Sequence, residues 1–222
     1  MDTLLRRAHP QMNDRKAHKY QMIVFDLDGT LLDTKYSILA GFRDLYEETR
    51  KERRPLDELE FVLGGDSLAL LDSMGFPEGT IDQWLKNISR YAHTVHPFDG
   101  IPDTLSALRQ EGFILSVATN KLRIEYEEIM ECHGLKDFME HSICLDEVSH
   151  AKPDPEPLLY LAERLEIPLN EMLFIGDTSY DKDCAKAAGC HFALAGWGAS
   201  GELKKECAAV LESPGDLLSL LS

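Results

Sequence analysis

Two aspartates, Asp26 and Asp28, end a short apolar run in the stretch IVFDLDGTLLDT, with one residue between them. In an extended chain residues i and i+2 point to the same side, so both carboxylates would enter one space if the chain stays extended through Leu27. Two charges about 4 Å apart repel each other by about 4 kcal/mol at an effective dielectric constant of about 20. The pair is therefore costly without a shared proton or a hard cation such as Mg²⁺, which binds carboxylates and keeps positions for water or phosphate.

A second acidic pair lies in the stretch GDTSYD, where Asp177 ends another apolar run and Asp181 follows four residues later. In the first turn of a helix this spacing would place the two side chains on one face. Asp181 could equally be an ordinary acidic residue at a helix start, where carboxylates are common.

A lysine and a hydroxyl–amide pair are further candidates for chemistry. Lys152 precedes a proline in AKPDPEP, which restricts its backbone to extended geometry, so it could meet a dianionic phosphate or hold the carboxylates. Taken alone, a solvated surface lysine is the commoner case. Thr119 and Asn120 end the apolar run FILSVAT and offer a hydroxyl and adjacent amides, although alone they would pass for the start of a turn.

Short β-rich apolar runs alternate with amphipathic segments along most of the chain. The expected strands cover residues 22–27, 113–119, 141–145, 172–177 and 191–196, and helical patterns fill the segments between them. This alternation predicts right-handed crossovers and an α/β fold, with a Rossmann-like parallel sheet covered by helices on both faces. Chemistry in such folds lies beyond the carboxyl ends of the strands, which is where Asp26, Thr119 and Asp177 fall.

Residues 36–96 break the alternation, because they carry helical patterns but no convincing core strand. We therefore expect a small α-helical cap domain over residues 36–96, inserted after the first strand, and a core domain formed by residues 21–35 and 97–222. The cap loop Leu63–Ser67, with two glycines before a possible helix cap, is either a substrate-specificity loop or a plain turn. Residues 1–20 are polar and locally basic, and we expect a flexible extension there.

Composition and charge narrow the class of partner. Hydrophobic residues make up 44% of the chain and charged residues 28%, and no apolar run approaches the ~20 residues of a membrane helix. The net charge of −16 makes nucleic acid and anionic membranes poor partners, whereas a small anionic substrate fits if a cation offsets the field. The cysteines are scattered, which favours reduced thiols in the cytoplasm. The first residues do not resemble a secretory signal, which also favours a cytoplasmic protein.

The stretches DLDGTLLDT, VATNK, AKPDPEP and GDTSYD occur in this order, each at or after the end of an expected strand. Together they resemble the four motifs of the haloacid dehalogenase-like hydrolase superfamily. The resemblance runs from about Gln21 to the C-terminus, and the helical insert is similar to the cap of the superfamily's capped subfamily IA.

This resemblance implies a covalent phosphatase mechanism. Asp26 would attack phosphorus to give an aspartyl-phosphate, and Asp28 would act as general acid and then as general base. Thr119, the backbone of Asn120 and Lys152 would hold the phosphoryl oxygens. Mg²⁺ would be held by the carboxylate of Asp26, the carbonyl of Asp28, Asp177, and Asp181 as a ligand or an orienting neighbour.

The presence of Asp28 favours phosphate esters or anhydrides, because the dehalogenase and phosphonatase branches lack an aspartate there. The segments TNK, AKPDPEPL and Trp197-Gly198 look most like phosphoglycolate phosphatases. We expect a phosphoric monoester hydrolase, monomeric or homodimeric, for a small phosphorylated metabolite such as 2-phosphoglycolate. The alternatives are a β-phosphoglucomutase-like phosphosugar mutase, a pyrophosphatase or nucleotidase of similar build and, from another class, a non-catalytic protein of this fold.

Overall fold

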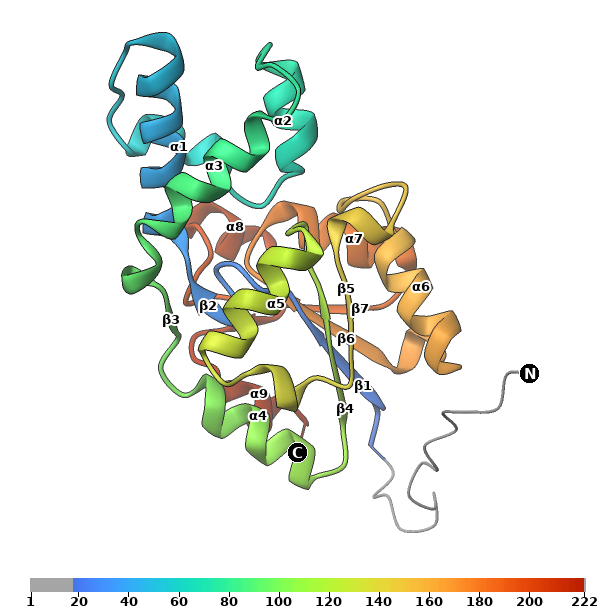
Figure 1. Cartoon of the computed structure of the whole chain (residues 1–222). Helices are drawn as coiled ribbons and strands as arrows, with labels where there is room; N and C mark the ends of the chain where they lie inside the picture. Colours follow the sequence, from blue (N-terminus) through green and yellow to red (C-terminus); the bar gives the residue numbers. More distant parts are fainter. Residues whose placement is uncertain (1–17, 222) are drawn as a thin grey trace, which may run out of the picture.

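The computed structural model describes residues 18–221, and Figure 1 shows how the chain is arranged. Of the extension expected over residues 1–20, residues 1–17 lie outside the described part. Tyr20 is buried and meets His191 edge-on, with ring centroids 5.1 Å apart, so the core includes at least this residue of the expected extension. Within residues 18–221 no helix has the length and apolar character needed to cross a membrane.

One six-stranded sheet, in which every neighbouring pair is parallel, forms the centre of the molecule. Its strands, in spatial order, are β5 (His141–Ile143), β4 (Ile114–Ala118), β1 (Met22–Phe25), β6 (Met172–Gly176), β7 (His191–Ala195) and β8 (Val210–Leu211). β1 can lie in the middle because all four of its residues are apolar and buried, as a strand covered on both faces requires. The predicted α/β fold with a parallel sheet is confirmed, and the two-residue strand β8 has no counterpart among the expected strands.

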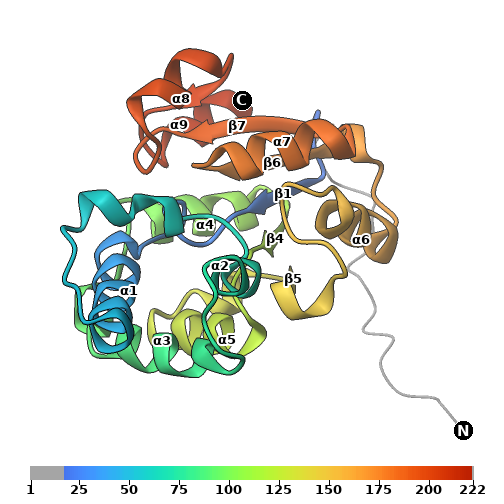
Figure 2. The same ribbon diagram turned by 90° about the horizontal axis from the view of Figure 1, so that it is seen from above.

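Helices cover both faces of the sheet, as Figures 1 and 2 show from two directions. One face packs against side chains of α4 (Ile101–Gln110), α5 (Arg123–Cys132) and α9 (Asp216–Leu221), and the other against α6 (Glu156–Leu165) and α7 (Ser179–Ala188). Alternate residues of β1 divide between the two clusters, because a strand has a two-residue period. The core also contains α8 (Gly201–Glu206) and the 3₁₀ turns η3 (Lys136–Phe138), η4 (Leu145–Glu147) and η5 (Leu169–Glu171).

The segment between β2 (Leu32–Asp33) and β3 (His96–Pro97), which we call the cap, forms a helical layer beyond one end of the sheet (Figure 1). It contains α1 (Lys35–Arg50), η1 (Asp57–Val62), α2 (Ser67–Ser73), α3 (Thr80–Ser89) and η2 (Ala92–Thr94). The cap has a hydrophobic cluster of its own around Phe42, Leu45 and Trp84, and every buried member of that cluster comes from the cap. α1 ends at Arg50, where Lys51 takes a φ of 60° and donates its backbone N–H to the carbonyl of Glu47.

The two connections between core and cap pair with each other as a short antiparallel ribbon, β2 (Leu32–Asp33) with β3 (His96–Pro97). A further hydrogen bond from Phe98 N to Leu31 O, 3.2 Å long, extends the contact. The chain therefore enters and leaves the cap at the same place, close to the carboxyl end of β1. Strands of two residues are too short to show a two-residue period, so this ribbon leaves no signal in the sequence.

Candidate active site

Three neighbouring strands present polar side chains at one edge of the sheet. Asp26 directly follows β1, Thr119 follows β4 and Asp177 follows β6. Backbone hydrogen bonds continue the ladder to this edge, from Asp26 N to Ile175 O at 2.8 Å and from Thr119 N to Ile143 O at 3.1 Å. These bonds fix the points at which Asp26 and Thr119 leave the sheet.

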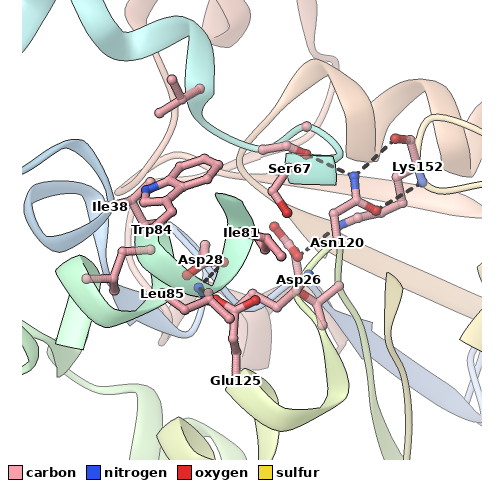
Figure 3. Close-up of a pocket in the computed structure, with 16 residues that line it drawn as sticks. Asp26, Asp28, Ile38, Ser67, Ile81, Trp84, Leu85, Asn120, Glu125 and Lys152 are labelled. Carbon is pink, nitrogen blue, oxygen red and sulfur yellow. Dashed lines mark hydrogen bonds and ion pairs between the residues drawn. The ribbon is translucent and has the colours of Figure 1, made fainter. Parts of the chain in front are cut away.

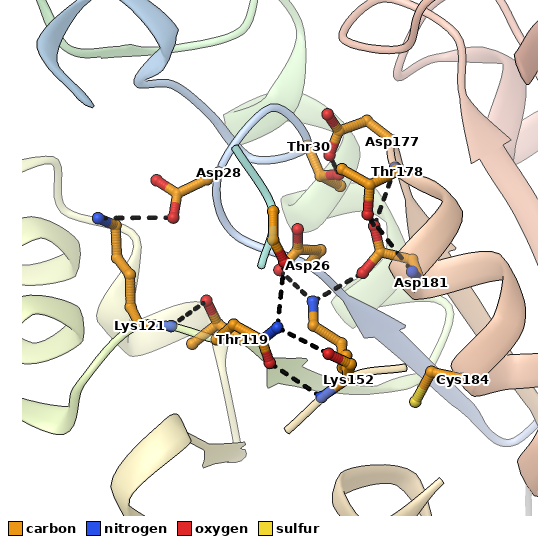
Figure 4. Close-up of polar contacts among 12 residues, drawn as sticks. Asp26, Asp28, Thr30, Thr119, Lys121, Lys152, Asp177, Thr178, Asp181 and Cys184 are labelled. Atoms are coloured by element: carbon orange, nitrogen blue, oxygen red, sulfur yellow. Dashed lines mark hydrogen bonds and ion pairs between the residues drawn. The ribbon is translucent and has the colours of Figure 1, made fainter. Parts of the chain in front are cut away.

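Three carboxylates meet beyond the end of β1. Oxygen atoms of Asp26, Asp177 and Asp181 all lie within 4.8 Å of one another. The ammonium of Lys152 reaches two of them, with Nζ 2.7 Å from Oδ1 of Asp26 and 2.7 Å from Oδ1 of Asp181 (Figure 4). One buried ammonium thus faces three carboxylates, and a hard divalent cation is the partner that such an oxygen set suits.

Burial and crowding of like charges shift the titration of this cluster. Burial, followed by the charge of Asp181, raises the pKa of Asp26 to about 7, although Lys152 opposes both. Burial and then the charges of Asp181 and Asp26 raise the pKa of Asp177 well above its ordinary value. Burial acts to lower the pKa of Lys152, but the charges of Asp181 and Asp26 outweigh burial and raise it. A cation that takes the place of a proton in this cluster would stabilise the ionised form of these carboxylates.

Asp181 uses its two oxygens in different ways. Oδ2 accepts hydrogen bonds from the backbone N–H of Thr178 at 3.0 Å and from its hydroxyl at 2.6 Å, within the capping box that begins α7. Oδ1 accepts from Lys152. Both interpretations of Asp181 in the sequence therefore hold, because the residue takes part in the capping box of α7 and also belongs to the carboxylate cluster.

Asp177 packs closely against the turn that follows Asp28. Thr30 Oγ1 donates a hydrogen bond to Oδ1 of Asp177 at 3.0 Å. Gly29 has a φ of +77°, and a Cβ atom there would lie only 2.2 Å from Oδ2 of Asp177. Only glycine permits both this backbone conformation and this approach, so position 29 helps to place the carboxylate. The sequence indicates Thr30 only as part of a turn, and its contact with Asp177 is not visible there.

Asn120 joins the loop after β4 to the loop that carries Lys152. Its Oδ1 accepts from Lys152 N at 3.0 Å, and its Nδ2 donates to Lys152 O at 3.1 Å. The same Nδ2 donates to Gly64 O of the cap at 3.0 Å. The side chain of Lys152 is only 2% exposed, so it is not the solvated surface lysine that its residue type alone would suggest.

Asp28 lies on the opposite side of Asp26 from Asp177 and Asp181 (Figure 4). Its Oδ2 is 3.5 Å from Nζ of Lys121, and that Nζ is also 3.1 Å from Oε1 of Glu125. Its Oδ1 is buried and has no hydrogen-bond partner within the described part of the chain. Asp26 and Asp28 nevertheless line one cavity, so the structure brings the pair to a common space without a direct contact.

Lys121 and Glu125 also line this cavity, although the sequence analysis assigns neither a role. Burial acts to lower the pKa of Lys121, but the charges of Asp28 and Glu125 outweigh it and raise the pKa, so the ammonium stays charged. Only the spacing in the sequence points to these two residues. Lys121 comes two residues after Thr119, and Glu125 comes four residues after Lys121, a spacing that brings two side chains together on a helix.

The cap closes a small cavity of about 50 Å³ over Asp26 and Asp28 (Figure 3). Gly64, Gly65 and Ser67 line it, which places part of the loop Leu63–Ser67 against the candidate site. Asp66 holds this loop at the start of α2 by accepting hydrogen bonds from two backbone N–H groups, at 2.8 and 3.0 Å. The loop is therefore more than a remote turn, because it forms a wall of the cavity.

The family model of haloacid dehalogenase-like hydrolases matches residues 23–195 of this chain. The match spans most of the sequence and contains the four strand-end motifs, so the chain belongs to this family. The resemblance that the motifs indicate is confirmed, and the protein is a hydrolase by family.

Two relatives and one solved structure are similar over most of their length. A phosphoglycolate phosphatase of Aquifex aeolicus is 31% identical over 205 residues, which cover 90% of this chain and 96% of the relative. The pyrophosphatase PpaX of Halalkalibacterium halodurans is 30% identical over 183 residues, with 81% and 85% covered. A solved structure from Lactobacillus plantarum has a TM-score of 0.82 at 25% identity and covers 91% of this chain and 99% of its own. The relatives' names are those of enzymes that cleave phosphate esters or anhydrides.

Proposed function

We propose that this protein is an Mg²⁺-dependent phosphatase that hydrolyses a small phosphate monoester through an aspartyl-phosphate on Asp26. The observation that carries the proposal is the setting of Asp26. It lies at the end of the central strand, one of its oxygens is held by a buried lysine, and two further carboxylates stand beside it. A second aspartate with an unpaired oxygen, Asp28, lines the same cavity.

In the first step Asp26 attacks phosphorus, a P–O bond to its carboxylate forms, and the bond to the leaving oxygen breaks. Asp28 donates its proton to that oxygen, which therefore leaves as a neutral hydroxyl group of the alcohol. In the second step water attacks phosphorus, Asp28 takes up the proton, and the bond to Asp26 breaks. The products are an alcohol and inorganic phosphate, and both aspartates return to their starting states.

The other residues of the site bind and orient. Thr119, the backbone of Asn120 and Lys152 hold the phosphoryl oxygens, whose charge they offset. The donor set fits Mg²⁺, with ligands from the carboxylates of Asp26 and Asp177 and the carbonyl of Asp28, and the bound ion would neutralise charge on the phosphoryl group. Asp181, whose oxygens already serve Lys152 and Thr178, orients the lysine beside these ligands.

The names of the relatives supply candidate substrates. One relative is named for phosphoglycolate and the other for pyrophosphate, and both are small phosphorylated compounds. 2-Phosphoglycolate remains the monoester that the sequence resemblance favours. The cap walls the cavity on the side where the leaving group must lie, so the cap is what discriminates among such compounds.

The test is phosphate release from a panel of phosphate monoesters with Mg²⁺, measured for the wild type and for Asp26→Asn. The variant keeps the size of the side chain but cannot form an acyl phosphate, so we expect kcat to fall at least about 1,000-fold. Asp103→Asn, at an exposed position of α4, is the matched control and should keep full activity. An Asp26→Asn protein with unimpaired turnover would overturn the covalent mechanism.

A further inference from the structure

The cap presents apolar surface toward the reacting groups. If the phosphoryl group lies against Asp26 and Lys152, as the proposed function requires, the remainder of the substrate faces this wall. Figure 3 shows Ile38, Trp84 and Leu85 gathered on the cap side of the cavity. The cap side chains that line the cavity are Ile38, Val62, Ser67, Ile81, Trp84, Leu85 and Ile88. Only Ser67 and Trp84 among them carry a polar group, and the indole Nε1 of Trp84 is buried without a hydrogen-bond partner in the described part of the chain.

Both lysines that line the cavity are already shared between carboxylates. Lys152 contacts Asp26 and Asp181 at 2.7 Å each, and Lys121 lies 3.5 Å from Asp28 and 3.1 Å from Glu125. No arginine and no other lysine is among the described residues that line this cavity. A second anionic group on the substrate would therefore find no cation that is free to receive it.

A larger cleft of about 860 Å³ adjoins the cavity, with Val62, Gly65 and Lys152 lining both. It runs between cap residues 61–73 and the core loop 149–155. Its other lining residues with acidic or basic side chains are Asp66, Asp154 and His150, and a ring nitrogen of His150 lies 3.0 Å from a carboxylate oxygen of Glu156. A substrate that extended into this cleft would again meet carboxylates and no unpaired lysine or arginine among the described residues.

We infer that the leaving group of the substrate is an uncharged alcohol that lays apolar surface against the cap wall. This inference rests on the proposed phosphatase function and deepens it by specifying the substrate class. An ionised group placed against apolar side chains loses its hydration and gains no partner, which is costly. Among the candidate substrates, esters with a second anionic group, such as 2-phosphoglycolate, are accordingly poor ones for this chain.

The sharpest test compares 2-phosphoglycolate with its amide, 2-phosphoglycolamide. The two esters have the same number of heavy atoms and differ in the charge of the leaving group. We expect kcat/KM of the wild-type enzyme to be at least about tenfold higher for the amide, a ratio that corresponds to about 1.4 kcal/mol. An aryl phosphate, assayed in parallel, reports whether the protein is a phosphatase at all.

A cation placed in the cap wall should weaken this preference. Leu85 is only half buried, lines the cavity and lies outside the cap's hydrophobic cluster, so it can be replaced without opening that cluster. The quantity to compare is the ratio of kcat/KM for the carboxylate ester to kcat/KM for the amide ester. We expect this ratio to be at least about tenfold higher in Leu85→Lys than in Leu85→Gln, whose new side chain has similar length and no charge.

The outcomes separate the inference from the proposed function. Hydrolysis of the aryl ester, with the amide no better than the carboxylate, would overturn the inference and leave the phosphatase standing. A wild-type preference for the amide supports the inference even if a Leu85 variant fails to fold. Failure to hydrolyse all three esters would remove the proposed function and this inference with it.

Discussion

The ammonium of Lys152 lies 2.7 Å from Oδ1 of Asp181, in an ion pair whose side chains are 2% and 0% exposed. The same ammonium reaches Asp26 at the same distance, so Asp181 sets how strongly Lys152 is drawn toward Asp26. Asp181 is itself fixed by the capping box of α7. The position of the lysine is thus tied to the start of a helix, which is a rigid point of the fold.

Asp181→Asn should lower kcat by at least about tenfold and leave the protein folded. The substitution keeps the shape of the side chain but removes one of the two charges that hold Lys152, so the lysine would pair with Asp26 alone and restrain it. Steady-state kinetics and circular dichroism check this. Asp183→Asn, at an exposed position of the same helix, should behave as the wild type. A fully active Asp181→Asn protein would show that Asp181 does no more than cap α7.

Mg²⁺ should stabilise the protein more at about pH 8 than at about pH 5. Burial and the charge of Asp181 raise the pKa of Asp26 to about 7 in the folded protein, from about 3.9 in an unfolded chain, so the folded state binds more protons between these pH values. The stability of the metal-free protein therefore falls as pH rises through this window, and its contribution from Asp26 is lost above about pH 7. Mg²⁺ competes with the proton and should restore the loss.

Thermal unfolding with EDTA and with Mg²⁺ at the two pH values measures this effect. The increase in Tm caused by Mg²⁺ should be larger at the higher pH. An increase that is equal at both values, or absent at both, would contradict a metal site in this cluster. Na⁺ at equal ionic strength controls for general screening of the net charge of −16.

The sequence was sufficient to bring Asp26, Thr119 and Asp177 to one edge, because each ends an apolar run and parallel strands end at the same edge. It could not show that Lys121 is shared between Asp28 and Glu125. That contact depends on how the start of α5 sits beyond β4, which no local pattern specifies. The ribbon of β2 and β3 escaped prediction for a different reason, since two-residue strands depend on pairing between residues distant in the sequence.

Lys121→Met should lower kcat, because it leaves the carboxylates of Asp28 and Glu125 near each other without their shared cation. The loss should be at least about tenfold, since an uncompensated buried charge is strongly unfavourable. Removing the second charge as well, in Lys121→Met with Glu125→Gln, should recover part of the activity. The wild type, the single variants Lys121→Met and Glu125→Gln, and the double variant form a double-mutant cycle. Additive effects in it would mean that the two residues do not act together on Asp28.

Gly29→Ala should lower kcat far more than its backbone strain alone would. The methyl group would stand 2.2 Å from Oδ2 of Asp177 and would push that carboxylate out of the cluster. Gly75→Ala is a matched control, because Gly75 has a similar φ of +69° and a Cβ there would meet no atom within 4 Å. Both variants carry the cost of a left-handed residue, about 1 kcal/mol, but only the first displaces a candidate metal ligand.

We expect kcat to fall at least about 100-fold for Gly29→Ala and to stay near the wild-type value for Gly75→Ala. Equal activity of the two proteins, measured below their melting temperatures, would show that the position of Asp177 does not govern turnover.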